Sequence, residues 1–224
     1  MENIKYVNVI GAGLAGCECA WILAKNGIKV KLYEMKPIKK SEAHKSDNFA
    51  ELVCSNSLKS DEITNACGLL KKEMQMLGSI FVEAAHKTRV EAGQALAVDR
   101  EKFAEYITDK IKNDNNIEII YEEVDDVEKL EGITVIATGP LTSKPLLETI
   151  SKLVGEEKLY FYDAEAPIVS ADSIDMNIAY RMNRYGKIGE GDYLNLPMTK
   201  DEYFSFYNAL ITAEEAPRHD FDKL

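Results

Sequence analysis

The sequence has no apolar stretch that reaches the ~18–20 residues needed to cross a bilayer, which argues against a membrane-spanning helix. Its first ten residues are too few and too mixed in polarity for a secretory signal. Four cysteines in 224 residues, without an export signal, argue against a disulfide-rich secreted scaffold. We therefore expect a cytoplasmic protein that is not attached to a membrane.

Patterns typical of metal ligands are also scarce. Cys17 and Cys19 lie two positions apart on a predicted helix, so their side chains point to roughly opposite sides. No histidine follows them at the spacing of a zinc site. The three histidines, His44, His86 and His219, are isolated from one another, and we interpret them as surface or loop residues. No metal site is expected.

Basic residues are fewer than acidic ones: the sequence has 27 Lys and Arg residues and 38 Asp and Glu residues, for a formal net charge of −11. This balance argues against a protein that binds polyanions by bulk charge alone. Basic residues do gather locally in one polar segment, and a solvated loop is the plainer interpretation of that cluster: Lys36, Lys39, Lys40 and Lys45.

The N-terminal segment has the pattern of a strand, a helix and a second strand. Residues 6–10 are a short apolar run, and residues 14–24 are almost wholly apolar or small, as expected for a helix packed on a sheet. The helix is predicted to end at Asn26-Gly27, and residues 28–33 form the second strand, which ends at Glu34. Such a βαβ unit builds a parallel sheet.

The loop between the first strand and the helix has the spacing Gly-x-Gly-x-x-Gly. The first glycine allows a tight turn, the second lets a diphosphate approach the backbone, and the third lets helix and strand pack closely. Free N–H groups at the helix start would hold the phosphates, and Glu34 would accept hydrogen bonds from the adenosine ribose. The alternative is a purely structural turn. The predicted cofactor-binding residues are Gly11, Ala12, Gly13, Leu14, Ala15, Gly16 and Glu34.

A later strand favours FAD over NAD in this site. Residues 133–137 predict a buried strand that leads into Thr138 and Gly139. Flavoproteins of the two-dinucleotide-binding type bring such a strand back beside the flavin diphosphate, where a glycine avoids a clash. The carboxylate of Glu34 also disfavours a 2′-phosphate, and hence NADP, in this position. Thr138 and Gly139 therefore join the predicted FAD-binding residues.

The remaining segments predict two domains. Residues 68–85 indicate a helix with an apolar stripe at Leu69, Leu70, Met74 and Leu77, Asp99 caps a further helix to residue 113, and residues 117–121 form a strand. We expect residues 1–143 to form a Rossmann-like FAD-binding domain of α/β class.

After residue 143 the sequence becomes richer in tyrosine and in short alternating segments. Residues 160–169, 177–185 and 193–198 predict antiparallel strands, and residues 201–214 predict a closing helix. We expect residues 144–224 to form an inserted, mostly antiparallel α+β substrate domain, incomplete in this chain.

Cys54 is the one cysteine in a polar setting. It is followed by Ser55, Asn56 and Ser57, a run that can cap a helix and direct amide groups at the sulfur, which would lower the pKa of the thiol. The alternative is a small buried hydrophobic residue, and this segment alone leaves both interpretations open. We predict Cys54 as the catalytic residue.

Six motifs occur in an order that resembles the bacterial folate- and FAD-dependent tRNA (uracil-5-)-methyltransferases, known as TrmFO. The resemblance covers essentially the whole chain, and the Cys-Ser-Asn-Ser-Leu element is distinctive. The motifs are Gly11-Ala-Gly-Leu-Ala-Gly-Cys-Glu18, Phe49-Ala-Glu-Leu-Val-Cys-Ser-Asn-Ser-Leu58, Ala95-Leu-Ala-Val-Asp-Arg100, Ile136-Ala-Thr-Gly-Pro-Leu-Thr-Ser143, Asp163-Ala-Glu-Ala-Pro167 and Asp192-Tyr-Leu-Asn195.

The resemblance implies formation of ribothymidine in the tRNA T-loop. The carbon comes from 5,10-methylenetetrahydrofolate and is reduced by FADH2, which NAD(P)H regenerates. In this chemistry a thiolate adds to uracil C6, the activated C5 attacks the folate methylene, a base removes the C5 proton, and a hydride completes the methyl group. Cys54 matches one of two family cysteines assigned to the thiolate and base roles, and which of them it has stays open.

The sequence also departs from that family. Members are roughly twice as long, and their second functional cysteine lies in a Phe-Glu-Gly-Cys element beyond residue 224. We therefore expect a truncated chain that binds FAD weakly and does not catalyse methyl transfer alone.

Three alternatives remain at this stage. A GidA-type wobble-uridine enzyme shares FAD, folate and tRNA, but usually has a histidine where this chain has Leu14. A ribosomal-RNA uracil methyltransferase would use the same chemistry. A non-catalytic remnant that binds flavin or RNA is the third.

Overall fold

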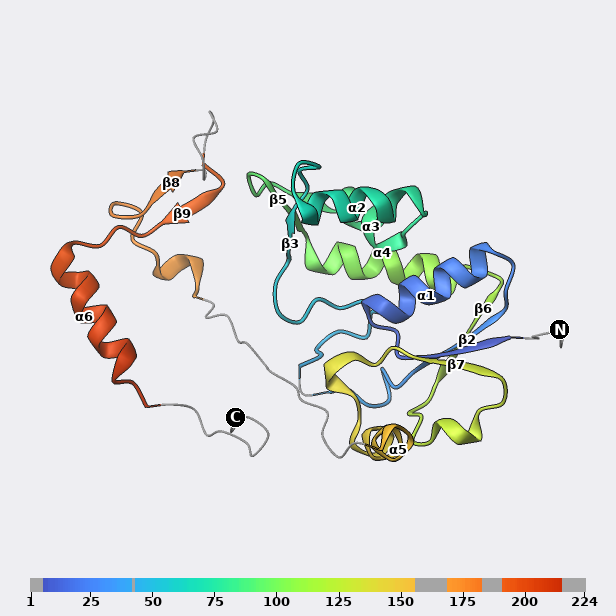
Figure 1. The fold of residues 1–224 in the computed structure, drawn as a ribbon. Coiled ribbons are helices and arrows are strands. Elements are labelled where there is room, and N and C mark those ends of the chain that lie inside the picture. Colours follow the sequence, from blue (N-terminus) through green and yellow to red (C-terminus); the bar gives the residue numbers. More distant parts are fainter. Residues whose placement is uncertain (1–5, 42, 156–168, 183–190, 215–224) are drawn as a thin grey trace. The chain divides into compact units, whose positions relative to one another are not determined.

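The computed structural model describes residues 6–41, 43–155, 169–182 and 191–214 (Figure 1). The chain divides into two compact units. The first comprises residues 1–90 and 94–161, and the second comprises residues 91–93 and 162–224. No helix in the described ranges is both long enough and apolar enough to span a membrane.

The first unit is built on a four-stranded parallel sheet. The strand β1 (Val7–Ile10) lies between β2 (Val30–Glu34) and β7 (Ile133–Ile136), and β6 (Ile117–Tyr121) extends the sheet beyond β2. All three pairs are parallel. All four residues of β1 are buried, as expected for a central strand covered on both faces. The predicted βαβ opening and its α/β class are confirmed.

Helices cover both faces of this sheet (Figure 1). On one face α1 (Leu14–Lys25), α3 (Ile80–Lys87) and α4 (Arg100–Lys112) pack around a core that includes Val9 and Leu32. On the other face Leu146 of α5 (Lys144–Val154) packs against Ile10, Tyr33 and Val124. Val9 and Leu32 face one side of the sheet and Ile10 and Tyr33 face the other, because successive side chains of a strand point to opposite faces.

The helix α5 follows the domain boundary that we expected at residue 143. Because Leu146 is buried among sheet residues, this helix belongs to the first unit by its contacts. Between β6 and β7 the acidic segment contains the short 3-10 helix η1 (Val127–Lys129), and a second one, η2 (Gly139–Leu141), follows β7. The assignment of the later residues to a substrate domain stays a proposal.

A small antiparallel sheet of order β3-β5-β4 also belongs to the first unit. Its strands are β3 (Ser57–Ser60), β4 (Arg89–Val90) and β5 (Ala95–Val98). The predicted helix over residues 68–85 is instead two helices, α2 (Ala66–Met76) and α3, because Gly78 has a φ of +82° and Ser79 caps α3.

The apolar stripe predicted on α2 was wrong for three of its four members. Leu69, Leu70 and Leu77 are exposed, while the buried residues of α2 are Gly68 and Lys71. An alanine Cβ at Gly68 would lie 2.0 Å from the carbonyl oxygen of Glu62. The helix therefore packs against the preceding turn through its glycine, and its leucines face outward.

The second unit contains a two-stranded antiparallel sheet and one helix. The strands are β8 (Tyr180–Met182) and β9 (Tyr193–Asn195), and α6 (Lys200–Ile211) begins at a capping box of Thr199 and Glu202. The 3-10 helix η3 (Ala171–Ser173) precedes them. Strands are thus present within two of the predicted segments, and the final helix is present one residue earlier at its start and three residues shorter at its end; residues 183–185 of the first segment lie outside the described residues. The predicted strand at 160–169 lies outside the described residues except for its last position.

Candidate functional site

A cavity of ≈ 320 Å³ lies in the first unit at the carboxyl ends of the parallel strands. Its walls come from the glycine loop, the end of β2, the segment after β6, the turn after β7 and the start of α5. In open α/β sheets a ligand binds at this edge, where the strand order reverses. Here the chain leaves β1 toward β2 on one side and returns through β7 on the other.

The three glycines of the loop have different surroundings. Gly11 has a φ of +95°, and a Cβ there would lie 2.9 Å from the carbonyl oxygen of Ala137. A Cβ at Gly16 would lie 1.8 Å from the carbonyl oxygen of Gly11. A Cβ at Gly13 would meet no described atom within 4 Å. Gly11 and Gly16 are therefore required by packing, whereas Gly13 leaves open space at the cavity.

The helix α1 begins at this loop with its backbone N–H groups available. Gly13 is the N-cap and offers no side chain, and the first turn contains no acidic residue. The first backbone bond of the helix runs from the N–H of Cys17 to the carbonyl of Gly13. The N–H groups of Leu14, Ala15 and Gly16 precede that bond and have no intrahelical acceptor, which makes the helix start a site for an anion.

Glu34 lies directly against the glycine loop. Its Oε2 accepts a hydrogen bond from the N–H of Ala12 at 2.8 Å, and its Oε1 accepts one from the N–H of Lys36 at 2.9 Å. The side chain is only 7% exposed and lines the cavity. Two backbone bonds fix the carboxylate, and each oxygen retains lone-pair capacity for a hydroxyl group of a ligand.

Thr138 and Gly139 lie opposite the loop, at the end of β7. The N–H of Ala137 donates to the carbonyl of Ile10 at 2.8 Å, which holds the β7 end beside β1. Gly139 has a φ of +63°, and a Cβ there would meet no described atom within 4 Å. The Thr138 hydroxyl lies 2.6 Å from that of Thr142. The structure thus brings eight of the nine predicted cofactor-binding residues to one cavity, while the ninth, Gly16, is buried in α1 against Gly11.

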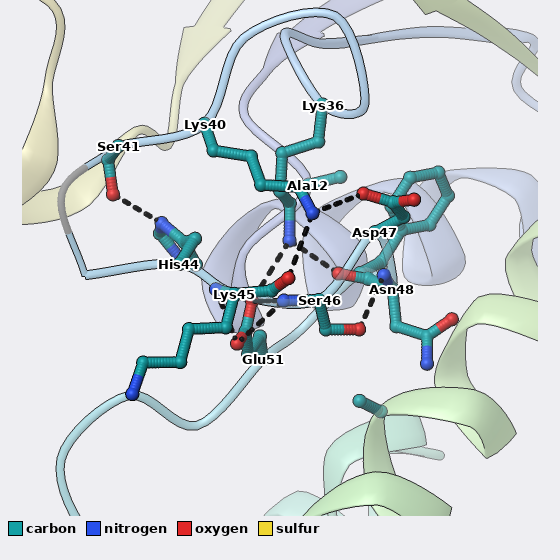
Figure 2. Close-up of polar contacts among 12 residues, drawn as sticks. Ala12, Lys36, Lys40, Ser41, His44, Lys45, Ser46, Asp47, Asn48 and Glu51 are labelled. Carbon is teal, nitrogen blue, oxygen red and sulfur yellow. Dashed lines mark hydrogen bonds and ion pairs between the residues drawn. The ribbon is translucent and has the colours of Figure 1, made fainter.

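The segment after β2 contributes cavity residues that sequence reasoning missed. Lys36, predicted as part of a solvated loop, is only 3% exposed. Its Nζ donates to the carbonyl of Asn48 at 2.5 Å and lies 3.6 Å from Oε2 of Glu51 (Figure 2). Glu51 in turn accepts hydrogen bonds from the N–H groups of Lys45 and Ser46. This network fixes the loop that forms one wall of the cavity.

His44 is also part of that wall and is half-buried. Its Nδ1 lies 2.6 Å from the hydroxyl oxygen of Ser41 (Figure 2). Burial, followed by the nearby Lys36 ammonium, lowers the pKa of His44, and the carboxylates of Glu51 and Glu34 oppose this effect. His44 therefore lies on a loop, as expected, but faces the cavity as a neutral imidazole near pH 7.

Cys54 lies on an exposed segment beyond the cavity wall, and its neighbour Val53 lines the cavity. The carbonyl of Cys54 accepts a hydrogen bond from Nη2 of Arg100 at 2.8 Å. The expectation that the following polar run caps a helix was wrong. Asn56 instead exchanges hydrogen bonds with Val98 and leads into β3, because its amide pairs with an adjacent strand.

Cys17 occupies a different kind of position. Its thiol is fully buried and donates to the carbonyl of Ala12 at 3.3 Å. Burial raises the pKa of this thiol far above its usual range. A buried thiol that stays protonated is a packing residue rather than a nucleophile.

Comparison with known proteins adds to this geometry. The sequence model of the family described as "Glucose inhibited division protein A" (GidA) matches residues 6–224. The chain belongs to this family.

Curated relatives of this GidA-family chain are named "Methylenetetrahydrofolate--tRNA-(uracil-5-)-methyltransferase TrmFO". One from Fusobacterium nucleatum is 59% identical over 98% of this chain and 50% of its own length. Those from Acetivibrio thermocellus and Listeria innocua are each 57% identical over the same shares. The resemblance carried by the six motifs is thereby confirmed. The chain spans about half the length of the curated relatives that it matches.

A solved structure of GidA from Aquifex aeolicus is 25% identical to this family member, with a TM-score of 0.44. The match covers 54% of this chain and 20% of that one.

Proposed function

We propose that this chain forms the FAD-binding part of a cytoplasmic methyltransferase that converts a T-loop uridine of tRNA to ribothymidine. The carbon donor is 5,10-methylenetetrahydrofolate and the reductant is NAD(P)H. The observation that carries the proposal is the cavity beside the glycine loop, with Glu34 bonded to the loop at Ala12. The TrmFO names of relatives at 57–59% identity support the choice of reaction.

The residues of the cavity fit an FAD molecule. Its diphosphate would face the open backbone at Gly13 and the free N–H groups of Leu14 and Ala15. Glu34 would accept bonds from the adenosine ribose, and Gly139 would let the diphosphate approach the end of β7. No carboxylate occupies the first turn of α1, so nothing in that turn opposes an anion.

The flavin would supply the reducing equivalents that complete the methyl group. This chain's own residues would bind the cofactor and supply the thiol chemistry. Cys54 would contribute a thiolate that adds to uracil C6, or a base that removes the C5 proton. Its exposed position allows a macromolecular substrate to reach it. The residues from 144 onward would form part of the surface for folate and tRNA.

The first test measures FAD binding by the chain through the quenching of flavin fluorescence. Glu34→Gln should weaken FAD binding about 10–100-fold, because it removes a charged acceptor worth ~1.5–3 kcal/mol. Glu118→Gln is the matched control, since Glu118 is an exposed residue of β6 outside the cavity. Equal affinity for FAD in both variants would contradict the assignment of Glu34.

The second test measures methyl transfer to purified tRNA and, separately, to ribosomal RNA. The chain is compared with a version extended to the length of its relatives, and the extended version is compared with its Cys54→Ser variant. We expect tRNA methylation only from the extended version, and its loss in the variant. Methylation of ribosomal RNA alone would overturn the choice of substrate.

A further inference from the structure

A second cavity, of ≈ 560 Å³, lies in the first unit between the end of β3 and the helices α2 and α3. It shares no lining residue with the cavity at the glycine loop. Its lining residues include three lysines: Lys71, Lys72 and Lys87.

The two carboxylates that line this cavity are compensated by other cations. Asp61 lies 3.3 Å from Nη1 of Arg89. Glu83 lies 3.1 Å from Nζ of Lys110 and accepts a hydrogen bond from the Tyr106 hydroxyl. The hydrogen bond from Tyr106 and the nearby ammonium groups of Lys110 and Lys87 lower the pKa of Glu83.

The three lysines lack such close contacts, although Lys87 is near enough to Glu83 to help lower the pKa of that carboxyl. Among the described residues none of them lies within 4.0 Å of a carboxylate oxygen, and Lys72 bonds only to the neutral amide of Gln75, at 2.9 Å. Lys71 is only 7% exposed, and its Nζ donates to the carbonyls of Ser60 and Cys67 at 2.9 and 3.3 Å. An ammonium group has three donors, so a third is left for a ligand. The cavity is therefore a local excess of positive charge in a chain of net charge −11.

We propose that this cavity binds a backbone phosphate of the RNA substrate, an inference that rests on the proposed function. The strand β3 leads from the Cys54 segment to the cavity. Seven residue steps separate Cys54 from Asp61, which limits the distance to about 23 Å at ~3.3 Å per residue. A strand of RNA can cover that distance, with one base at the thiol and a phosphate at the lysines. A compact anion could occupy the lysines or the region of the thiol, but could not reach both.

The net negative charge of this chain favours a localised cationic site. A chain with net charge −11 repels RNA at long range, so binding depends on local cations that neutralise particular phosphates. Lys72 and Lys87 are exposed and reachable, while Lys71 lies deeper and is held in place by two carbonyls. One phosphate could therefore accept hydrogen bonds from Lys71 on the inner side of the cavity and from Lys72 and Lys87 on its outer side.

The experiment measures binding of a fluorescently labelled T-arm RNA hairpin to the chain by anisotropy at several salt concentrations. The variant is K72Q/K87Q, and the control is K129Q/K152Q, which removes the same charge at exposed positions outside the cavity. We expect the slope of log affinity against log salt to fall by about 0.7–0.9 in the variant, the contribution of one phosphate. The control should retain its slope, and both should bind FAD like the parent chain.

The outcomes separate this inference from the proposed function. Equal slopes in variant and control, with RNA binding intact, would overturn the phosphate site and leave the RNA substrate in place. A version extended to the length of the relatives that binds FAD but not the hairpin would contradict the RNA substrate itself, and the phosphate site with it. Circular dichroism of each variant checks that the fold is kept.

Discussion

Gly13 and Gly16 lie three residues apart at the start of α1 but differ in what surrounds them. Gly13→Ala should leave the free energy of unfolding unchanged or slightly raised, because the new Cβ meets no described atom and φ is −74°. The same methyl group should weaken FAD binding by at least about tenfold, since it occupies the approach to the backbone.

Gly16→Ala is the matched comparison. Its Cβ would overlap the carbonyl oxygen of Gly11, so we expect a loss of ~1–3 kcal/mol in stability. Urea unfolding and a flavin titration measure the two quantities. If both variants lost stability equally and bound FAD equally, the distinction between a binding glycine and a packing glycine would be wrong.

His44 gives the fold a dependence on pH. Its pKa is lowered in the folded chain, so below pH ~6.5 the unfolded chain binds the proton more readily and stability falls as pH falls. Replacing His44 with Gln should make the melting temperature less sensitive to pH between about 5 and 7. Thermal melts of both proteins across that range test this, and identical pH profiles would exclude a role of His44.

The residues of the cavity differ in how far the sequence predicts them. The glycines and Glu34 follow from spacing, because a fixed loop geometry needs them at fixed intervals. Lys36, His44 and Glu51 have no such signal, since they lie in an irregular segment whose shape depends on hydrogen bonds to its own backbone. Burial of Lys36 could not be read from a basic, polar stretch.

At the scale of elements, α2 and α3 show where periodicity misleads. A helical stripe of leucines predicts burial, yet the turn at Gly78 redirects the chain and leaves Leu77 78% exposed. Ile80, just past the turn, is fully buried. The apolar periodicity correctly predicted helical structure over these residues, but it missed the break between α2 and α3. A single glycine inside a helical pattern gives an ambiguous signal.

This contrast predicts a difference between two substitutions three residues apart. Leu77→Ala should change the free energy of unfolding by less than about 0.5 kcal/mol, whereas Ile80→Ala should cost about 2–5 kcal/mol through loss of buried contacts. Chemical denaturation of both variants is the measurement. A large loss for Leu77→Ala would mean that its side chain is covered in solution.

At the scale of the whole molecule, the single tryptophan reports on one unit. Trp21 lies on α1, is 6% exposed, and its indole N–H donates to the carbonyl of Gly78. FAD at 100 times its dissociation constant should stabilise the first unit by about 2.7 kcal/mol, or roughly 5–10 °C. Tryptophan fluorescence during heating measures this shift. An undiminished shift in the Glu34→Gln variant at the same FAD concentration would contradict the site.

The position of β1 between β2 and β7 has a consequence for synthesis. The wall of the cavity at Thr138 comes from a strand that emerges from the ribosome about 100 residues after Glu34. At ~5–20 residues per second this gap lasts about 5–20 seconds. During that interval a nascent chain has its glycine loop but no β7 strand beside it, so we expect capture of the proposed dinucleotide to wait until the later strand is translated.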